Sequence, residues 1–180
     1  MRGPREQEQG NETIVADADG IITHIPHLRR YARALTGNHA WADDLVQDTL
    51  ERAWSRMTLW RRDSNIRAWL FTIMHNLYVN QIKAGARGRK TNEPQLDIPV
   101  SASQENRLEI RDLTKALQQL SAEQREVVLL IGLEQLSYEE AAKVLRVPVG
   151  TVMSRLSRGR EQLRIIMNRG SSSATLKAIK

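Results

Sequence analysis

The sequence predicts an all-α fold, in which two small helical domains are joined by a flexible linker. Apolar residues recur every three or four positions over most of the 180 residues, which is the spacing of one helix face. No segment alternates between apolar and polar residues for long enough to require a sheet. Between the two helical stretches the composition shifts to proline, glycine and polar residues. The expected order is a disordered leader (1–20), a helical domain (21–85), the linker (86–106), a second helical domain (107–168) and a loose tail (169–180).

Composition limits the class of protein. The formal net charge is +6, which favours a polyanionic partner but says nothing about the fold. There is no cysteine, so disulfides, thiolate metal sites and cysteine nucleophiles are excluded. No apolar run approaches the roughly 20 residues of a membrane span, and the first residues lack an apolar signal core. We therefore expect a cytoplasmic chain with no membrane partner. His24 and His27 lack nearby co-ligands in the sequence and are interpreted as surface residues, so no metal is expected.

Three helices are expected in the first domain, each with an apolar stripe at helical spacing. The first carries Ile25, Leu28, Ala32 and Leu35 and ends at residues 36–38. The second carries Trp41, Leu45, Thr49, Ala53 and Trp54, and the third carries Ile66, Trp69, Leu70, Ile73 and Leu77. A polar loop at residues 61–65 separates these last two helices.

Helical periodicity returns in the second domain with Leu108, Leu113, Leu117 and Leu120. Two capping boxes follow, in which a serine precedes a glutamine or glutamate by three residues. Ser121 and Gln124 begin one helix, whereas Ser137 and Glu140 begin a shorter one. Pro148 ends the shorter helix and suits the first turn of the next one.

The helix after Pro148 has two distinct faces. The apolar face carries Val152, Leu156, Gly159 and Leu163, and the polar face carries Thr151, Ser154, Arg155 and Arg158. Arginines with short hydroxyl neighbours on an exposed helix suit guanine edges and phosphates in a major groove. Residues 147–170 hold five arginines and one glutamate. The pattern predicts a DNA-reading helix-turn-helix. The alternative interpretation is an ordinary solvated face.

Three segments together resemble the sigma factors of bacterial RNA polymerase. Residues 42–49 are similar to the acidic helix of their region-two domain, and 66–76 to its promoter-melting helix. Residues 148–158 resemble the recognition helix of their region-four domain. The resemblance spans about residues 22–167 and assigns 21–85 to region two and 107–168 to region four. Larger sigma factors have a further domain between these two, which the short linker cannot hold. The resemblance therefore implies a sigma factor of the extracytoplasmic-function group.

The resemblance implies three sets of contact residues. Core RNA polymerase would dock on Asp43, Asp44, Gln47 and Asp48. The minus-ten element would be bound by Trp60, Arg61, Arg62, Asp63, Ser64, Asn65, Arg67, Asn76 and Lys83. The minus-thirty-five element would be bound by Thr151, Ser154, Arg155, Ser157 and Arg158. Met153 and Ser157 depart from the residues that are common in the family, which leaves the promoter sequence open.

The implied function is promoter-specific transcription initiation with stabilisation of the melted promoter. The implied partners are core RNA polymerase, promoter DNA and an anti-sigma factor, with no cofactor and no small-molecule substrate. Three alternatives remain open: an operator-binding regulator, a polymerase-associated decoy and an enzyme that acts on nucleic acid. The sequence has no catalytic motif or phosphate-cradling glycine loop, so we expect a protein that is not an enzyme.

Overall fold

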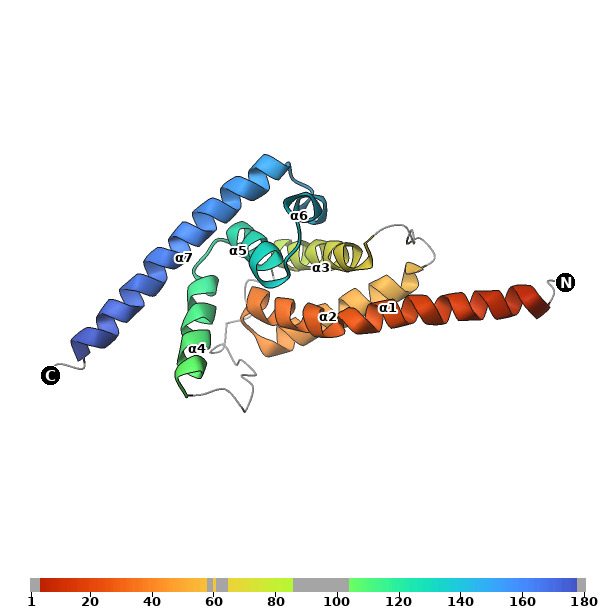
Figure 1. The fold of residues 1–180 in the computed structure, drawn as a ribbon, viewed down its shortest axis with the longest axis horizontal. Coiled ribbons are helices and arrows are strands. Elements are labelled where there is room, and N and C mark those ends of the chain that lie inside the picture. Colours follow the sequence, from red (N-terminus) through yellow and green to blue (C-terminus); the bar gives the residue numbers. More distant parts are fainter. Residues whose placement is uncertain (1–3, 58–59, 61–64, 86–103, 178–180) are drawn as a thin grey trace.

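The computed structural model describes the backbone of residues 4–57, 60, 65–85 and 104–177, and the side chains of 20–57, 60, 65–85 and 109–168. Within these ranges every regular element is helical (Figure 1). An N-terminal bundle consists of α1 (Pro4–Thr36), α2 (His39–Ser55) and α3 (Ile66–Lys83). A C-terminal bundle consists of α4 (Gln104–Gln118), α5 (Ala122–Val128), the π-helical turn η3 (Leu129–Leu133), α6 (Tyr138–Leu145) and α7 (Val149–Lys177).

The N-terminal bundle packs along the apolar stripes that the sequence predicts. Leu28, Leu35 and Leu45 are fully buried where α1 meets α2, and Leu70 is fully buried on α3. The chain reverses after α1 at Gly37, whose φ of 65° lies in the left-handed region that favours glycine. Asn38 and Asn65 cap α2 and α3, because their side-chain oxygens accept the otherwise unpaired amides of the first turn.

Both predicted capping boxes are present in the C-terminal bundle. Ser121 caps α5 and Ser137 caps α6, and in each box the residue three positions later reaches back to the cap backbone. Arg146 turns the chain between α6 and α7 with a φ of 54°. This sharp turn brings the apolar face of α7 onto α6, where Val152 and Leu156 are buried. The helix-turn-helix that the sequence predicts is therefore formed.

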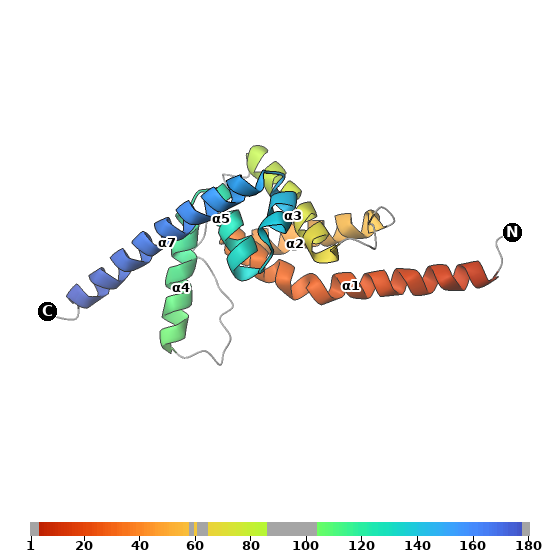
Figure 2. The same cartoon turned by 45° about the horizontal axis from the view of Figure 1, so that its top comes forward.

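The two bundles pack against each other, and their buried apolar side chains form one continuous cluster. Helix α1 contacts α4 and η3, and α3 packs against α6. Figures 1 and 2 show α6 beside α3, while α1 and α7 project from opposite ends of the molecule. Apart from the first residues of α4, the segment 86–106 lies outside the described residues.

Both ends of the chain differ from the expectation. We expected a disordered leader over residues 1–20, but α1 begins at Pro4. A helix can begin there because proline suits a first helical turn and the Arg, Glu and Gln residues that follow are good helix formers. We expected a loose tail from residue 169, but α7 continues to Lys177, because the sequence after Pro148 contains no further proline to stop it. Helix α4 begins at Gln104, inside the predicted linker.

Two predicted core residues are exposed. Trp54 is 59% exposed and Leu113 is 44% exposed, although both lie on stripes that the periodicity marks as apolar. Trp54 is in the last turn of α2 beside the fully buried Ala53, so it lies at the edge of the buried face. Among the described helices, none combines the length and the apolarity that a membrane crossing requires.

Candidate nucleic-acid and polymerase interface

Helix α2 divides into a buried apolar face and an exposed acidic face. Asp43, Asp44, Gln47 and Asp48 are all exposed, as the docking prediction requires. The Asp48 carboxylate accepts a hydrogen bond of 3.1 Å from Gln81 Nε2 on α3, and Gln81 Oε1 accepts one of 2.6 Å from Trp41 Nε1. These contacts fix one end of the acidic face relative to α3. The face can offer carboxylates to a basic partner surface.

The start of α3 holds two of the predicted minus-ten residues, and both contact the C-terminal bundle. Asn65 Oδ1 caps the helix by accepting from the amides of Arg67 and Ala68 at 3.0 and 3.3 Å. Its Nδ2 donates to Glu140 Oε1 on α6 at 2.6 Å. Arg67 Nη2 donates to Glu134 Oε2 at 3.1 Å and to the backbone carbonyl of Glu134. Both side chains therefore contact the C-terminal bundle, Arg67 partly buried and Asn65 exposed.

The other predicted minus-ten residues are less constrained. Asn76 Nδ2 donates to the carbonyl of Thr72 one turn earlier, at 2.7 Å, and Lys83 is exposed in the last turn of α3. The ring of Trp60 lies 6.3 Å from that of Trp69, so the two indoles pack together. Arg61, Arg62, Asp63 and Ser64 lie outside the described residues.

Helix α7 carries the predicted minus-thirty-five residues on its outer side. Ser157 and Arg158 are exposed, whereas Thr151, Ser154 and Arg155 are partly buried. Ser154 Oγ donates to the carbonyl of Thr151 at 3.0 Å, and Arg155 Nη2 lies 3.4 Å from Glu123 Oε2. Met153, which departs from the family pattern, is also 49% exposed on this helix. Arg158 is thus the predicted contact residue whose guanidinium is most accessible to DNA.

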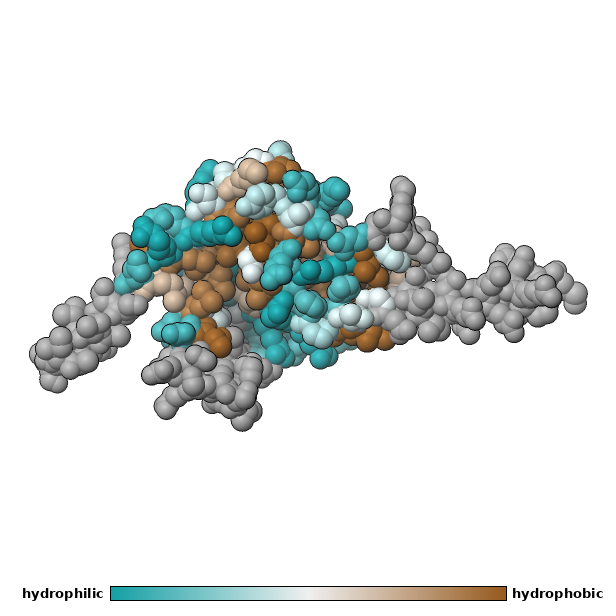
Figure 3. Space-filling model, viewed as in Figure 1, coloured by the Kyte–Doolittle hydropathy of each residue, from teal (hydrophilic) through white to brown (hydrophobic). Residues whose placement is uncertain are grey.

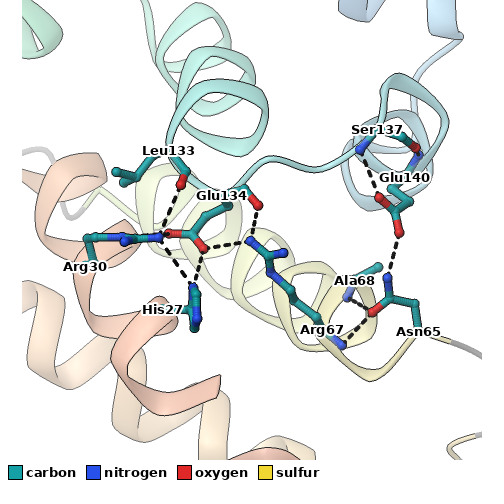
Figure 4. A network of polar contacts seen from close by, with 9 residues as sticks. All are labelled: His27, Arg30, Asn65, Arg67, Ala68, Leu133, Glu134, Ser137 and Glu140. Atoms are coloured by element: carbon teal, nitrogen blue, oxygen red, sulfur yellow. Dashed lines mark hydrogen bonds and ion pairs between the residues drawn. The ribbon is translucent and has the colours of Figure 1, made fainter. Parts of the chain in front are cut away.

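A buried carboxylate joins the two bundles (Figure 4). Glu134 follows η3 and is fully buried. Its Oε1 accepts from Arg30 Nε and Nη2 at 3.2 and 3.0 Å, and its Oε2 lies 3.0 Å from His27 Nδ1. With Arg67, these form a cationic cluster around one acidic group. Of these residues only Arg67 was predicted as functional, and His27, interpreted from the sequence as a surface histidine, contacts the buried carboxylate through Nδ1.

A second link between the bundles is Arg125, which follows the first capping box by one residue and was not singled out from the sequence. Its guanidinium donates to five acceptors, among them the carbonyl of Leu35 at the end of α1 at 2.8 Å and Gln118 Oε1 at 2.7 Å. Nearby, His75 Nδ1 lies 2.7 Å from Glu126 Oε1, so α3 is also tied to α5. Long-range polar contacts of this kind leave no periodic signal in the sequence.

Burial shifts several pKa values at this interface. Burial raises the pKa of Tyr78 to about 12, opposed by Arg125 and assisted by Glu126. Burial also raises the pKa of Tyr31 well above its ordinary value. Burial lowers the pKa of His24, and the positive charges of His27 and Arg67 lower it further. Within the described residues, no group of three or more His, Asp or Glu side chains could hold a metal ion.

An apolar groove of about 760 Å³ lies where α1, α4, η3 and α7 meet. Figure 3 shows this side of the molecule with apolar surface between α4 and α7 and hydrophilic residues around it. Leu113, Leu117 and Leu163 line the groove together with Val128 and residues of η3. Its other wall is basic and is formed by Arg29, Arg30 and Arg33 of α1.

Two protein-family models match the chain in the order of its bundles. The model of the "Sigma2 domain of PhyR" matches residues 21–75, and that of "Sigma-70, region 4" matches residues 110–163. The ECF RNA polymerase sigma factor EcfG of Rhodopseudomonas palustris is 36% identical over 155 residues, which cover 83% of each chain.

Two solved structures resemble this chain over most of its length. In the complex of the sigma factor RpoE with the anti-sigma factor NepR from Bartonella quintana, the matching chain superposes with a TM-score of 0.73 and 36% identity. The match covers 84% of this chain and 96% of that one. In the complex of CnrH with the cytosolic domain of CnrY, the TM-score is 0.62 at 29% identity, covering 92% and 90% of the two chains.

Proposed function

This chain belongs to the extracytoplasmic-function (ECF) family of RNA polymerase sigma factors, and we propose that it performs promoter-specific initiation with three surfaces. The acidic face of α2 docks on core polymerase, the region around α3 binds the melted minus-ten element, and α7 reads the minus-thirty-five element. The observation that carries the proposal is the pairing of an exposed acidic helix with a separate, basic helix-turn-helix in one chain of this family.

The docking surface is supported by exposure and charge. Asp43, Asp44 and Asp48 point away from a helix whose other face is fully buried, so the helix can contact a partner without unfolding. Carboxylates at such a surface set the orientation and rate of encounter with a basic partner. The polymerase supplies the chemistry, and the factor itself acts without catalysing a reaction. We place its action in the cytoplasm, where the polymerase works.

The DNA surfaces are supported by residue chemistry. Asn65, Asn76 and Lys83 offer amide and ammonium donors along α3, which suit base edges and the backbone of an unpaired strand. Arg158 on α7 suits a guanine edge or a phosphate in the major groove. Two weak DNA-binding surfaces in one chain bind a promoter more tightly together than either surface does alone, because binding of the second is intramolecular. Promoter selection therefore needs both bundles.

An anti-sigma factor is the proposed regulator. Two similar sigma factors have been solved with the partners NepR and CnrY, of which NepR is an anti-sigma factor. In this chain, the groove beside α4 offers an apolar floor with a partly exposed Leu113 and a wall of arginines. An amphipathic helix with acidic residues along one edge would complement it in both hydrophobicity and charge. We propose this groove as the docking surface of such a helix.

Reconstitution tests the function directly. Purified protein is mixed with bacterial core RNA polymerase, and co-elution and transcription from a library of genomic fragments are measured. We expect discrete start sites that are absent with core polymerase alone. Specific duplex binding without core binding would instead identify an operator-binding regulator.

Two variants should separate the surfaces. Arg158→Ala is expected to weaken promoter-specific initiation by about tenfold with unchanged core binding, because one arginine contact to DNA is lost. Arg164→Ala, further along α7, is the control. The double variant Asp44→Lys with Asp48→Lys should lose core binding and keep duplex binding. Its control reverses the exposed Glu109 and Asp112 of α4 in the same way. Equal loss of both activities in a folded variant would contradict the assignment.

A further inference from the structure

The cationic cluster around Glu134 is larger than a single carboxylate requires. Arg30 and Arg67 are always charged and together place three nitrogens at the carboxylate, and His27 adds a fourth at 3.0 Å. All three come from the N-terminal bundle, whereas Glu134 comes from the C-terminal bundle. Without Glu134, the N-terminal bundle would present at least two positive charges around an empty, carboxylate-sized space.

Carboxylate and phosphate oxygens are bound by the same guanidinium geometry. The fork of N–H donors in arginine pairs with either group at similar distances, so a site that holds one can hold the other. Arg67 also keeps donor capacity, because its Nε is buried without a hydrogen-bond partner among the described residues. The cluster therefore has the charge and the donors of a phosphate site.

The position of the cluster points to the promoter strand. Arg67 lies two residues after Asn65, and both belong to the proposed minus-ten surface. Each is occupied by a carboxylate of the C-terminal bundle, Arg67 by Glu134 and Asn65 by Glu140 (Figure 4). A nucleic-acid strand on this surface would have to displace both acidic groups.

We propose that His27, Arg30 and Arg67 form an anion site that binds a backbone phosphate of the unpaired promoter strand, and that Glu134 occupies this site as an intramolecular competitor. The proposal rests on the function proposed above and adds to it a phosphate site on α1. In the closed molecule the site is filled, so the isolated factor binds single-stranded DNA weakly. When the C-terminal bundle moves away, the same site becomes available to the strand.

The first test removes the competitor. Binding of a short, fluorescently labelled single-stranded oligonucleotide of mixed sequence is measured by anisotropy for the full chain. Glu134→Gln keeps the shape of the side chain and should tighten binding about tenfold, because a larger fraction of molecules is open. Glu139→Gln removes the same charge from an exposed position on α6 and is the control. Equal affinities of the two variants would overturn the competition.

The second test addresses the site itself. In the Glu134→Gln background, Arg30→Gln should weaken DNA binding and reduce the salt dependence by about one phosphate contact. Arg29→Gln, which removes an exposed arginine from the adjacent position of α1, should change both quantities less. If the two double variants bind alike, the cluster contributes only diffuse charge and the site is refuted.

A third test uses the unaltered Glu134, so it does not depend on the folding of that variant. The chain has no cysteine, and Glu51→Cys on α2 with Glu161→Cys on α7 introduces two exposed labelling positions. Energy transfer between the labels should fall when saturating oligonucleotide is added, because the bundles separate. Bound DNA with unchanged transfer would refute the competition. Failure of these tests would leave promoter-specific transcription by the holoenzyme intact, so the two proposals can fail separately.

Discussion

Gly159 lies where α7 crosses α5, and replacing it with alanine sets two effects against each other. A Cβ at this position would lie 2.8 Å from Val128 Cγ2, whereas ordinary carbon contacts are about 3.5–4.0 Å. Alanine in a helix interior gains about 1 kcal/mol over glycine. Overpacking a buried contact costs about 1–3 kcal/mol, and the branched Val128 has little rotamer freedom to relieve it. Gly159→Ala should therefore lower the free energy of unfolding by about 1 kcal/mol.

A double-mutant cycle isolates the clash. In a Val128→Ala background the nearest remaining atoms belong to Gln124 at 3.5 Å, so Gly159→Ala should now stabilise the chain by about 1 kcal/mol. The expected coupling is about 2 kcal/mol, measured by urea unfolding followed by circular dichroism. Gly150→Ala, which meets nothing within 4 Å in the same helix, serves as the control and should not depend on Val128. Equal effects of Gly159→Ala in both backgrounds would refute the packing argument.

Two further predictions concern the contact between the bundles. Arg125→Met should lower the free energy of unfolding by about 3–5 kcal/mol, because five acceptors lose a charged donor. Urea unfolding measures this loss. A loss below about 1 kcal/mol would mean that water replaces the guanidinium. Stability should also fall as the pH rises from about 10 to 12, because the pKa of Tyr78 is raised to about 12 in the folded chain while the unfolded chain ionises near 10. Tyr78→Phe should reduce this alkaline loss without abolishing it, because the pKa of the buried Tyr31 is raised as well. An unchanged pH profile would show that Tyr78 does not contribute to the loss.

The sequence predicted the local structure of this chain better than its long-range contacts. Helix faces, both capping boxes and the turn at Pro148 depend on residues within about one or two helical turns of each other. The capping boxes and the turn are confirmed, and so are the described apolar faces except at Trp54 and Leu113. Trp54 shows the limit of periodicity, because it lies at the edge of the apolar stripe and stays exposed while Ala53 beside it is fully buried. Periodicity marks a face as apolar without showing how wide its buried part is.

At the candidate site, the sequence predicted which side chains are exposed better than it predicted which distant residues they contact. The acidic face of α2 and Arg158 are exposed as expected, and these positions need only a correct helix register. Glu134 was not recognised, because glutamate is almost never fully buried unless it is paired, and a lone glutamate after an apolar run does not show such a partner. Its partners Arg30 and Arg67 lie 104 and 67 residues away, and one sequence without covariation cannot connect them.

The π-helical turn η3 holds one residue more than an α-helical turn would, directly before Glu134. In this turn the amide of Glu134 bonds to the carbonyl of Leu129, five residues earlier and not four. Deleting one residue from 130–133 would let the same amide and carbonyl close an ordinary α-helical turn, so Glu134 would keep its direction towards Arg30 and Arg67. Deleting one residue from 126–128 in α5 would instead rotate Glu134 by about 100° relative to Arg125. Descendants of this sequence could thus lose a codon within η3 and keep the two bundles joined, whereas a codon lost just before it would uncouple them.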